Sequence, residues 1–128
     1  MVSSRIDAHK QSSLDFLKLV VAGKIDEAYS NHVDMNGKHH NPFFAAGFPA
    51  LQKGMKENHS QFPDKKMNVK NVLADGDVVA VHSEIVMSPG GDRMTIVHIH
   101  RYHENKIVEL WDCGQVIPPD SPNKDGAF

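Results

Sequence analysis

Apolar residues in the first part of the chain recur at helical spacing. Between residues 7 and 22 they fall at intervals of three and four, at Leu14, Leu17, Val20 and Val21. This spacing predicts a helix with one apolar stripe, which Gly23 can end in a left-handed conformation. A second helix is expected over residues 24–33. Its buried side would carry Ile25, Ala28, Tyr29 and Val33.

A polar, irregular stretch separates this helical pair from a third helix. The run 34–37 (DMNG) is a turn signal, and residues 38–42 (KHHNP) should be a short extended segment, because proline keeps the preceding residue out of the helical region. A third helix is predicted from Pro49 to about Gln61, burying Leu51 and Met55. Two adjacent histidines therefore lie on irregular backbone.

The second half of the chain is rich in β-branched and aromatic residues and predicts strands. Residues 67–74 and 77–87 flank an Asp75-Gly76 turn, and a second hairpin covers residues 94–117. Helices followed by at least four antiparallel strands indicate an α+β fold. The tail 118–128 is too rich in proline and turn formers for a regular element. It is expected to be either frayed or laid across a surface through Phe128.

The last hairpin carries a histidine and an aspartate, and its register decides whether they meet. Asn105 tolerates a left-handed backbone, which favours a three-residue loop with a bulge at Lys106. That loop pairs His98 with Leu110, and side chains alternate faces along each strand. One face would then carry His98, His100, Tyr102, Val108, Leu110 and Asp112. A two-residue loop would put His98 and Asp112 on opposite faces.

The opposite face of this hairpin would carry Val97, Ile99, Arg101, Ile107, Glu109 and Trp111. Arg101 and Glu109 should lie diagonally within reach of an ion pair, which we interpret as structural. An outward-facing Trp111 beside valine and isoleucine predicts a dimer surface.

Length and charge narrow the possible functions. A chain of 128 residues with 40% hydrophobic content fits a single domain over 1–128. A net charge of -2 lacks the clustered basic residues that nucleic acid or anionic lipid requires, so the expected partners are a small molecule and a second copy of the chain. No secretory or membrane-spanning run is visible, which favours the cytoplasm. The single Cys113 is expected to be a small buried hydrophobic residue.

Nine histidines are the unusual feature of the composition. His98 and Asp112 stand out because both lie among apolar neighbours, where an unpaired carboxylate is costly. A carboxylate in a dry pocket can act as a general base toward an acidic C–H or as an acid toward an oxygen. The alternative is structural, with Asp112 bonded to backbone at a bulge and His98 satisfied by one hydrogen bond.

A metal site competes with this interpretation. His98 and His100 with Glu104 resemble the ligand spacing of cupin barrels, and His40 and His82 could complete a zinc or iron site. Against it, Glu104 lies in the inferred turn, no second motif of this kind is present, and helices open the chain. No metal or other cofactor is therefore predicted.

Several segments together resemble the SnoaL-like branch of the nuclear-transport-factor-2-like superfamily. They are residues 39–43 (HHNPF), 75–83 (DGDVVAVHS), 97–102 (VHIHRY), 106–115 (KIVELWDCGQ) and the tail 119–128. The resemblance implies a cone-shaped α+β barrel in which a strongly curved antiparallel sheet wraps around N-terminal helices, commonly as a homodimer. It differs at His100, where related sequences tend to have phenylalanine.

In polyketide cyclases of that branch, a histidine and an aspartate on the last two strands assist an aldol closure without a cofactor. The resemblance therefore implies that Asp112 is the acid or base and that His98 polarises or protonates the developing enolate oxygen. His40, His82 and His100 are further candidate ligand-binding residues. The sequence predicts a cofactor-independent lyase or isomerase acting on a small carbonyl compound. A non-catalytic dimeric binding module remains the alternative.

Overall fold

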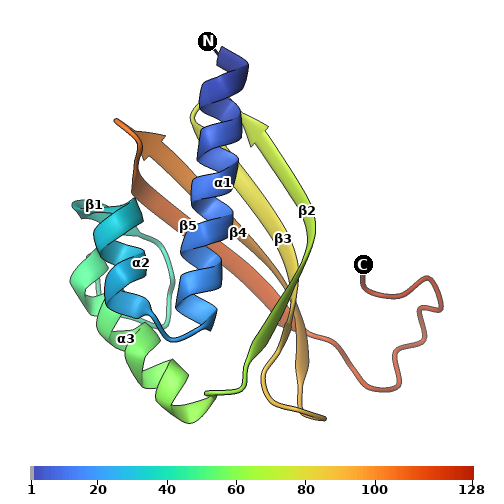
Figure 1. Cartoon of the computed structure of the whole chain (residues 1–128). Coiled ribbons are helices and arrows are strands. Elements are labelled where there is room, and N and C mark those ends of the chain that lie inside the picture. Colours follow the sequence, from blue (N-terminus) through green and yellow to red (C-terminus); the bar gives the residue numbers. More distant parts are fainter. Residues whose placement is uncertain (1) are drawn as a thin grey trace.

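The computed structural model describes residues 2–128 and arranges three helices and five strands in two layers (Figure 1). The helices are α1 (Val2–Val21), α2 (Ile25–His32) and α3 (Phe48–Gln61). The strands are β1 (Val33–His39), β2 (Lys66–Asp75), β3 (Val78–Val86), β4 (Arg93–His103) and β5 (Lys106–Val116). The expected α+β order is confirmed, with β1 inserted between the second and third helices.

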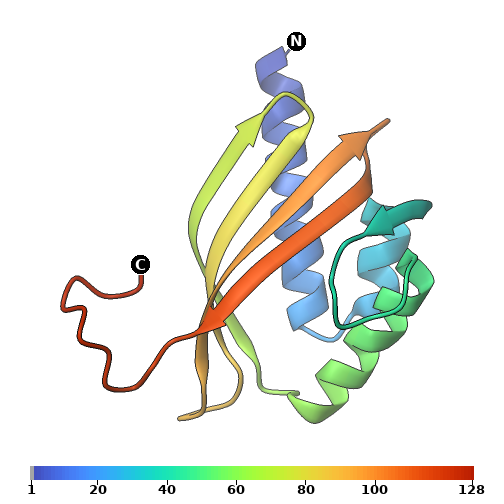
Figure 2. The same ribbon diagram turned by 180° about the vertical axis from the view of Figure 1, so that it is seen from behind.

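The five strands form one mixed sheet in the order β1-β5-β4-β3-β2. Strands β2 to β5 are antiparallel neighbours, as predicted, but β1 runs parallel to β5. Val33, which we expected to end the second helix, already has extended backbone and begins β1. Strands β1 and β2 are the two edges of the described sheet, so the expected cone is open rather than a closed barrel (Figure 2).

Helix α1 crosses the inner face of the sheet and holds the core in place (Figure 1). All four residues assigned to the buried side of the second helix are at most 5% exposed: Ile25, Ala28, Tyr29 and Val33. They pack with Phe16 and Leu17 of α1, with Phe48 and Leu51 of α3, and with inward residues of the sheet. None of the helices in residues 2–128 is long and apolar enough to cross a membrane.

The register of the last hairpin differs from the prediction. Glu104 and Asn105 both have positive φ (49° and 65°), so they form a two-residue loop that pairs His103 with Lys106. The bulge lies further along β5, where Val108 is the extra residue between the pairs Tyr102↔Ile107 and Arg101↔Glu109. Our three-residue loop, the bulge at Lys106 and the outward assignment of Ile107 were therefore wrong.

The bulge returns His98 and Asp112 to the same face of the sheet, which a two-residue loop alone would not do. Without the extra residue, His98 would lie opposite Trp111, and Asp112 would face the other side of the sheet. With it, His98 lies directly opposite Asp112. One additional residue in β5 thus puts both side chains on the inner face.

The tail after β5 is irregular and turns back over the outer face of the sheet. The ring centroids of Phe128 and His82 are 5.7 Å apart, and the Lys70 ammonium lies 5.1 Å from the Phe128 ring centroid. Of the two expected paths, the structure shows the tail laid across a surface through Phe128.

Candidate functional site

A cavity of about 580 Å³ opens beside the end of α1, between the helices and the inner face of the sheet. Apolar side chains of α1, α3 and the strands make up most of its lining. The polar lining residues are Asn41, Asn58, Lys65, His98, Asp112 and Cys113. A larger hollow of about 690 Å³ lies under the C-terminal tail, but neither His98 nor Asp112 lines it.

His98 on β4 and Asp112 on β5 are a directly opposed pair, and both line this cavity. Opposed residues of antiparallel strands point to the same face with their Cβ atoms about 5 Å apart. An imidazole and a carboxylate are therefore held side by side by the backbone of the sheet. The structure brings together the two residues to which the sequence assigned the chemistry.

Asn41 fixes one oxygen of Asp112 from the loop after β1. Its side-chain amide nitrogen donates a hydrogen bond to Asp112 Oδ2 at 3.1 Å. Its own Oδ1 accepts the backbone N–H of Phe43 at 3.0 Å, which sets the orientation of the amide. One Asp112 oxygen is thus positioned by the side chain of Asn41, whereas the structural alternative expected a bond to backbone at a bulge.

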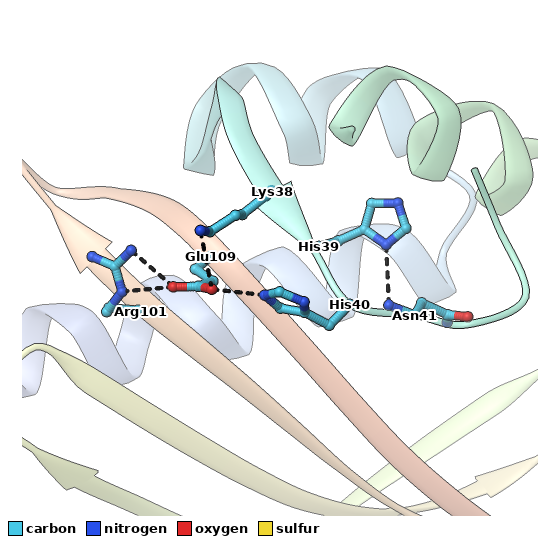
Figure 3. Close-up of polar contacts among 6 residues, drawn as sticks. All are labelled: Lys38, His39, His40, Asn41, Arg101 and Glu109. Atoms are coloured by element: carbon cyan, nitrogen blue, oxygen red, sulfur yellow. Dashed lines mark hydrogen bonds and ion pairs between the residues drawn. The ribbon is translucent and has the colours of Figure 1, made fainter. Parts of the chain in front are cut away.

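His39 shapes the loop that carries Asn41. The backbone N–H of Asn41 donates to His39 Nδ1 at 3.1 Å, a contact visible in Figure 3. Because Nδ1 accepts, Nε2 carries the proton and donates to the carbonyl oxygen of Ala45 at 2.8 Å. This buried histidine is structural, because its two hydrogen bonds join residues 41 and 45 of the loop that follows β1.

The environment of His98 favours the uncharged imidazole. Burial lowers its pKa below the usual value, the charge of Asp112 opposes this effect, and the positive charge of Lys65 adds to it. Its Nδ1 is buried without a hydrogen-bond partner among the residues that the structure describes. A neutral imidazole has one donor and one acceptor, so His98 keeps hydrogen-bonding capacity that the fold does not use.

Tyr29 lies close enough to Asp112 for the carboxylate charge to affect the pKa of its hydroxyl. Burial raises the pKa of the Tyr29 hydroxyl, and the negative charge of Asp112 raises it further. The phenol therefore stays protonated at neutral pH behind the cavity wall.

His100 is one of three candidate ligand-binding residues, and the structure places it in the core. It is fully buried, and its Nδ1 lies 2.9 Å from Ser13 Oγ, which is itself 2.8 Å from the Tyr102 hydroxyl. Burial lowers the pKa of His100 to about 3, with His98 and His32 adding to the effect. Its ring lies behind His98, with the centroids 6.3 Å apart, and is not part of the cavity lining.

His40 and His82, the other two candidates, lie on the outer face. His40 Nε2 is 2.7 Å from Glu109 Oε2, and its ring stacks on Trp111 with the centroids 5.1 Å apart. Arg101 also donates to Glu109 (Figure 3), and the distance from Arg101 Nη2 to Glu109 Oε1 is 2.9 Å. The predicted ion pair of Arg101 and Glu109 is confirmed, although the two residues are directly opposed rather than diagonal.

His82, on β3, makes polar contacts of its own, separate from those of His40. Its ring nitrogens lie 3.0 Å from Asn71 Nδ2 and 2.8 Å from Thr95 Oγ1. Neither His40 nor His82 lines the cavity.

The alternative metal set is dispersed. His98 faces the cavity, His100 is in the core, His40 and His82 are on the outer face, and Glu104 is in the exposed turn. Within residues 2–128 no three His, Cys, Asp or Glu side chains are grouped so that they could hold a metal ion. These residues therefore do not fit the cupin-like site that we weighed.

The sequence did not single out Lys65, Asn58 or Asn41 individually as lining residues. Lys65 follows a proline turn, where a lysine is usually solvated, and only the tertiary fold directs it to the cavity and to Asn58. Burial lowers the pKa of Lys65. Cys113 also borders the cavity and is exposed, so its assignment as a buried hydrophobic residue was wrong.

The family of SnoaL-like domains matches residues 14–110, which are most of the chain. This chain belongs to the SnoaL-like family. Among curated proteins, no sequence matches it significantly. The match to the family model confirms the superfamily branch that the sequence segments resemble.

Solved structures share the fold of this SnoaL-like protein. An NTF-2-like protein of unknown function from Burkholderia xenovorans has a TM-score of 0.71 and 18% identity, covering 91% of this chain and 88% of that one. AclR from Streptomyces galilaeus, a candidate hydroxylase, has a TM-score of 0.70 and 22% identity, with coverage of 86% and 90%. A SnoaL-like polyketide cyclase from Agrobacterium tumefaciens has a TM-score of 0.68 and 15% identity, with coverage of 84% and 91%. At such identities the likeness shows the fold alone.

Proposed function

We propose that this SnoaL-like protein is a cofactor-independent lyase or isomerase that acts on a small carbonyl compound. The observation that carries the proposal is the directly opposed pair of His98 and Asp112 at the wall of a mainly apolar cavity. A cavity of about 580 Å³ lies within the usual range for small-molecule sites.

Asp112 is the group that moves the proton. In a cavity of this kind its carboxylate can take a proton from the carbon next to a substrate carbonyl, which leaves an enolate. Asn41 holds Oδ2, so the carboxylate is oriented before the substrate arrives. The proton returns to the oxygen of an aldol product, or to a different carbon in an isomerisation.

His98 stabilises the oxygen on which negative charge develops. Its lowered pKa keeps the imidazole neutral, so an N–H can donate a hydrogen bond to the enolate oxygen. The apolar lining strengthens that bond, because few polar groups compete with it. A structural relative called a polyketide cyclase supports this class of reaction and leaves the substrate open.

Deuterium exchange tests this proposal without knowledge of the natural substrate. Apolar ketones such as 4-phenylbutan-2-one are incubated with the protein in D2O, and deuterium at the carbons next to the carbonyl is followed by NMR. Asp112→Asn and His98→Ala should each slow the exchange by about 100-fold or more. Asp64→Asn is the matched control, because that carboxylate is exposed and does not line the cavity. Exchange at the wild-type rate in both site variants would rule out the proposed roles.

A non-catalytic binding module is the second candidate, and the largely apolar lining favours it. Such a module would retain apolar ligands with the same affinity in Asp112→Asn, and neither protein would catalyse exchange above the buffer rate. The same set of proteins in the exchange experiment therefore separates the two functions.

We also propose a homodimer through the outer face of β4 and β5. Ile99 lies opposite Trp111, and Val97 lies on the same face of β4 as Ile99, which gives a row of outward apolar side chains. Lys38 and Arg101 form ion pairs with Glu109 at the edge of this row, and His40 also contacts the Glu109 carboxylate (Figure 3). A central apolar strip with polar groups at its rim suits a protein interface.

A further inference from the structure

The cavity contains one positive charge that the acid–base proposal does not use. Lys65 lies in the connection between α3 and β2, and its side chain lines the cavity. Its ammonium donates to Asn58 Oδ1, and Asn58 also lines the cavity. In the described part of the chain, no carboxylate lies within ion-pair distance of Lys65.

An ammonium in this position lacks a counter-charge. It is partly withdrawn from water, and burial lowers its pKa, which shows that the surroundings disfavour the charged form. A neutral amide oxygen solvates an ammonium less well than a carboxylate does. A ligand that brings an anionic group to Lys65 would supply the missing charge.

We infer that Lys65 and Asn58 form an anion-binding subsite, so that the ligands of this cavity are apolar compounds that carry a carboxylate. The inference deepens the proposed function and rests on it for the carbonyl part of the substrate. The anionic part follows from the position of Lys65 alone.

The charges of the cavity would also orient such a ligand. The negative charge of Asp112 and the positive charge of Lys65 both act on His98, in opposite directions. Among the lining residues, the remaining titratable side chain is Cys113. A carboxylate is repelled by Asp112 and attracted by Lys65, so it binds at Lys65 and leaves the other end of the ligand to Asp112 and His98.

A pair of probes that differ only in charge tests the subsite. The affinities of 4-phenylbutanoate and 4-phenylbutanamide for the wild-type protein are measured by titration calorimetry at pH 7. The carboxylate should bind at least about tenfold more tightly than the amide, because one charge-assisted hydrogen bond contributes a free energy of that size. Lys65→Met should abolish this preference, and Lys65→Arg should retain most of it. Lys66→Met is the matched control, because it removes the same charge from the exposed neighbouring residue.

Equal affinities of the two probes for the wild-type protein, or no binding of the carboxylate, would overturn the inference even if Lys65→Met failed to fold. A preference that persists in Lys65→Met would overturn it as well. Neither probe is a ketone or an aldehyde, so neither can form an imine with Lys65. If the probes behave as expected while ketones show no exchange, the subsite stands and the proposed reaction fails.

Discussion

Replacing His100 by leucine should make the fold less sensitive to acid. The imidazole is fully buried behind His98, and burial lowers its pKa from 6.5 to about 3. The unfolded chain therefore binds a proton at this residue more readily than the folded chain does. Stability contributed by the neutral imidazole is complete above about pH 6.5 and is lost as the pH falls from 6.5 toward 3.

The size of the effect follows from the two pKa values. At pH 5, protonation favours the unfolded chain by about 2 kcal/mol, whereas at pH 7 it contributes almost nothing. The result barely depends on the folded pKa, because any value near 3 leaves His100 neutral at pH 5. His9 and His98 also have lowered pKa values, but both proteins retain them, so their contributions cancel in the comparison.

Urea unfolding of the wild type and His100→Leu at pH 7 and pH 5 measures this difference, with Trp111 fluorescence as the signal. The protein concentration is kept fixed, since a dimer would make stability depend on it. The wild type should lose about 2 kcal/mol more than the variant between the two pH values. His103→Leu, on the exposed end of the same strand, is the matched control. An equal loss in the wild type and His100→Leu would show that the buried imidazole of His100 does not make the fold acid-sensitive.

Two further substitutions test the cavity wall and the outer face. Gly54→Ala should weaken the binding of 4-phenylbutanoate in calorimetry, because a Cβ at Gly54 would come within 2.3 Å of the ring of Phe44, which lines the cavity; unchanged affinity would show that the ring can move aside freely. Trp111→Ala should shift the protein in sedimentation equilibrium from a dimer toward the 14.2 kDa monomer. A wild type that already sediments as a monomer would contradict the dimer proposal.

The helices and the antiparallel strands β2 to β5 were predictable because their signals are local. Apolar spacing identified the buried side of α2, and the Asp75-Gly76 turn identified the β2–β3 hairpin. Most of strand β1 was not expected, because residues 34–37 were interpreted as a turn and the extended segment was expected to begin at residue 38. Its parallel pairing with β5 joins residues about 70 positions apart, and no local pattern specifies such a contact.

The relation between His98 and Asp112 was predicted for a reason that proved incorrect. The proposed loop and the proposed bulge were both misplaced. The two errors cancelled, so the side chains of His98 and Asp112 were still assigned to the same face. A bulge leaves no reliable mark in one sequence, because Val108 is an ordinary strand residue. The family resemblance implied the same pair without depending on the turn.

The surroundings of the pair were the least predictable part. Lys65 reaches the cavity only through the fold, and His100 faces inward with His98 but ends in the core because α1 covers it through Ser13. Sequence alternation gives the face of a strand, while the packing of a helix decides which part of that face is open to a ligand.

In the proposed reaction, Asp112 moves a proton within the cavity. The most direct test of this role measures binding and exchange of one ketone, 4-phenylbutan-2-one, on the same samples of wild type and Asp112→Asn. Both proteins should bind the ketone with similar affinity, and exchange into its carbons next to the carbonyl should fall about 100-fold or more in the variant. Equal binding with an equal exchange rate in the two proteins would contradict this role of Asp112.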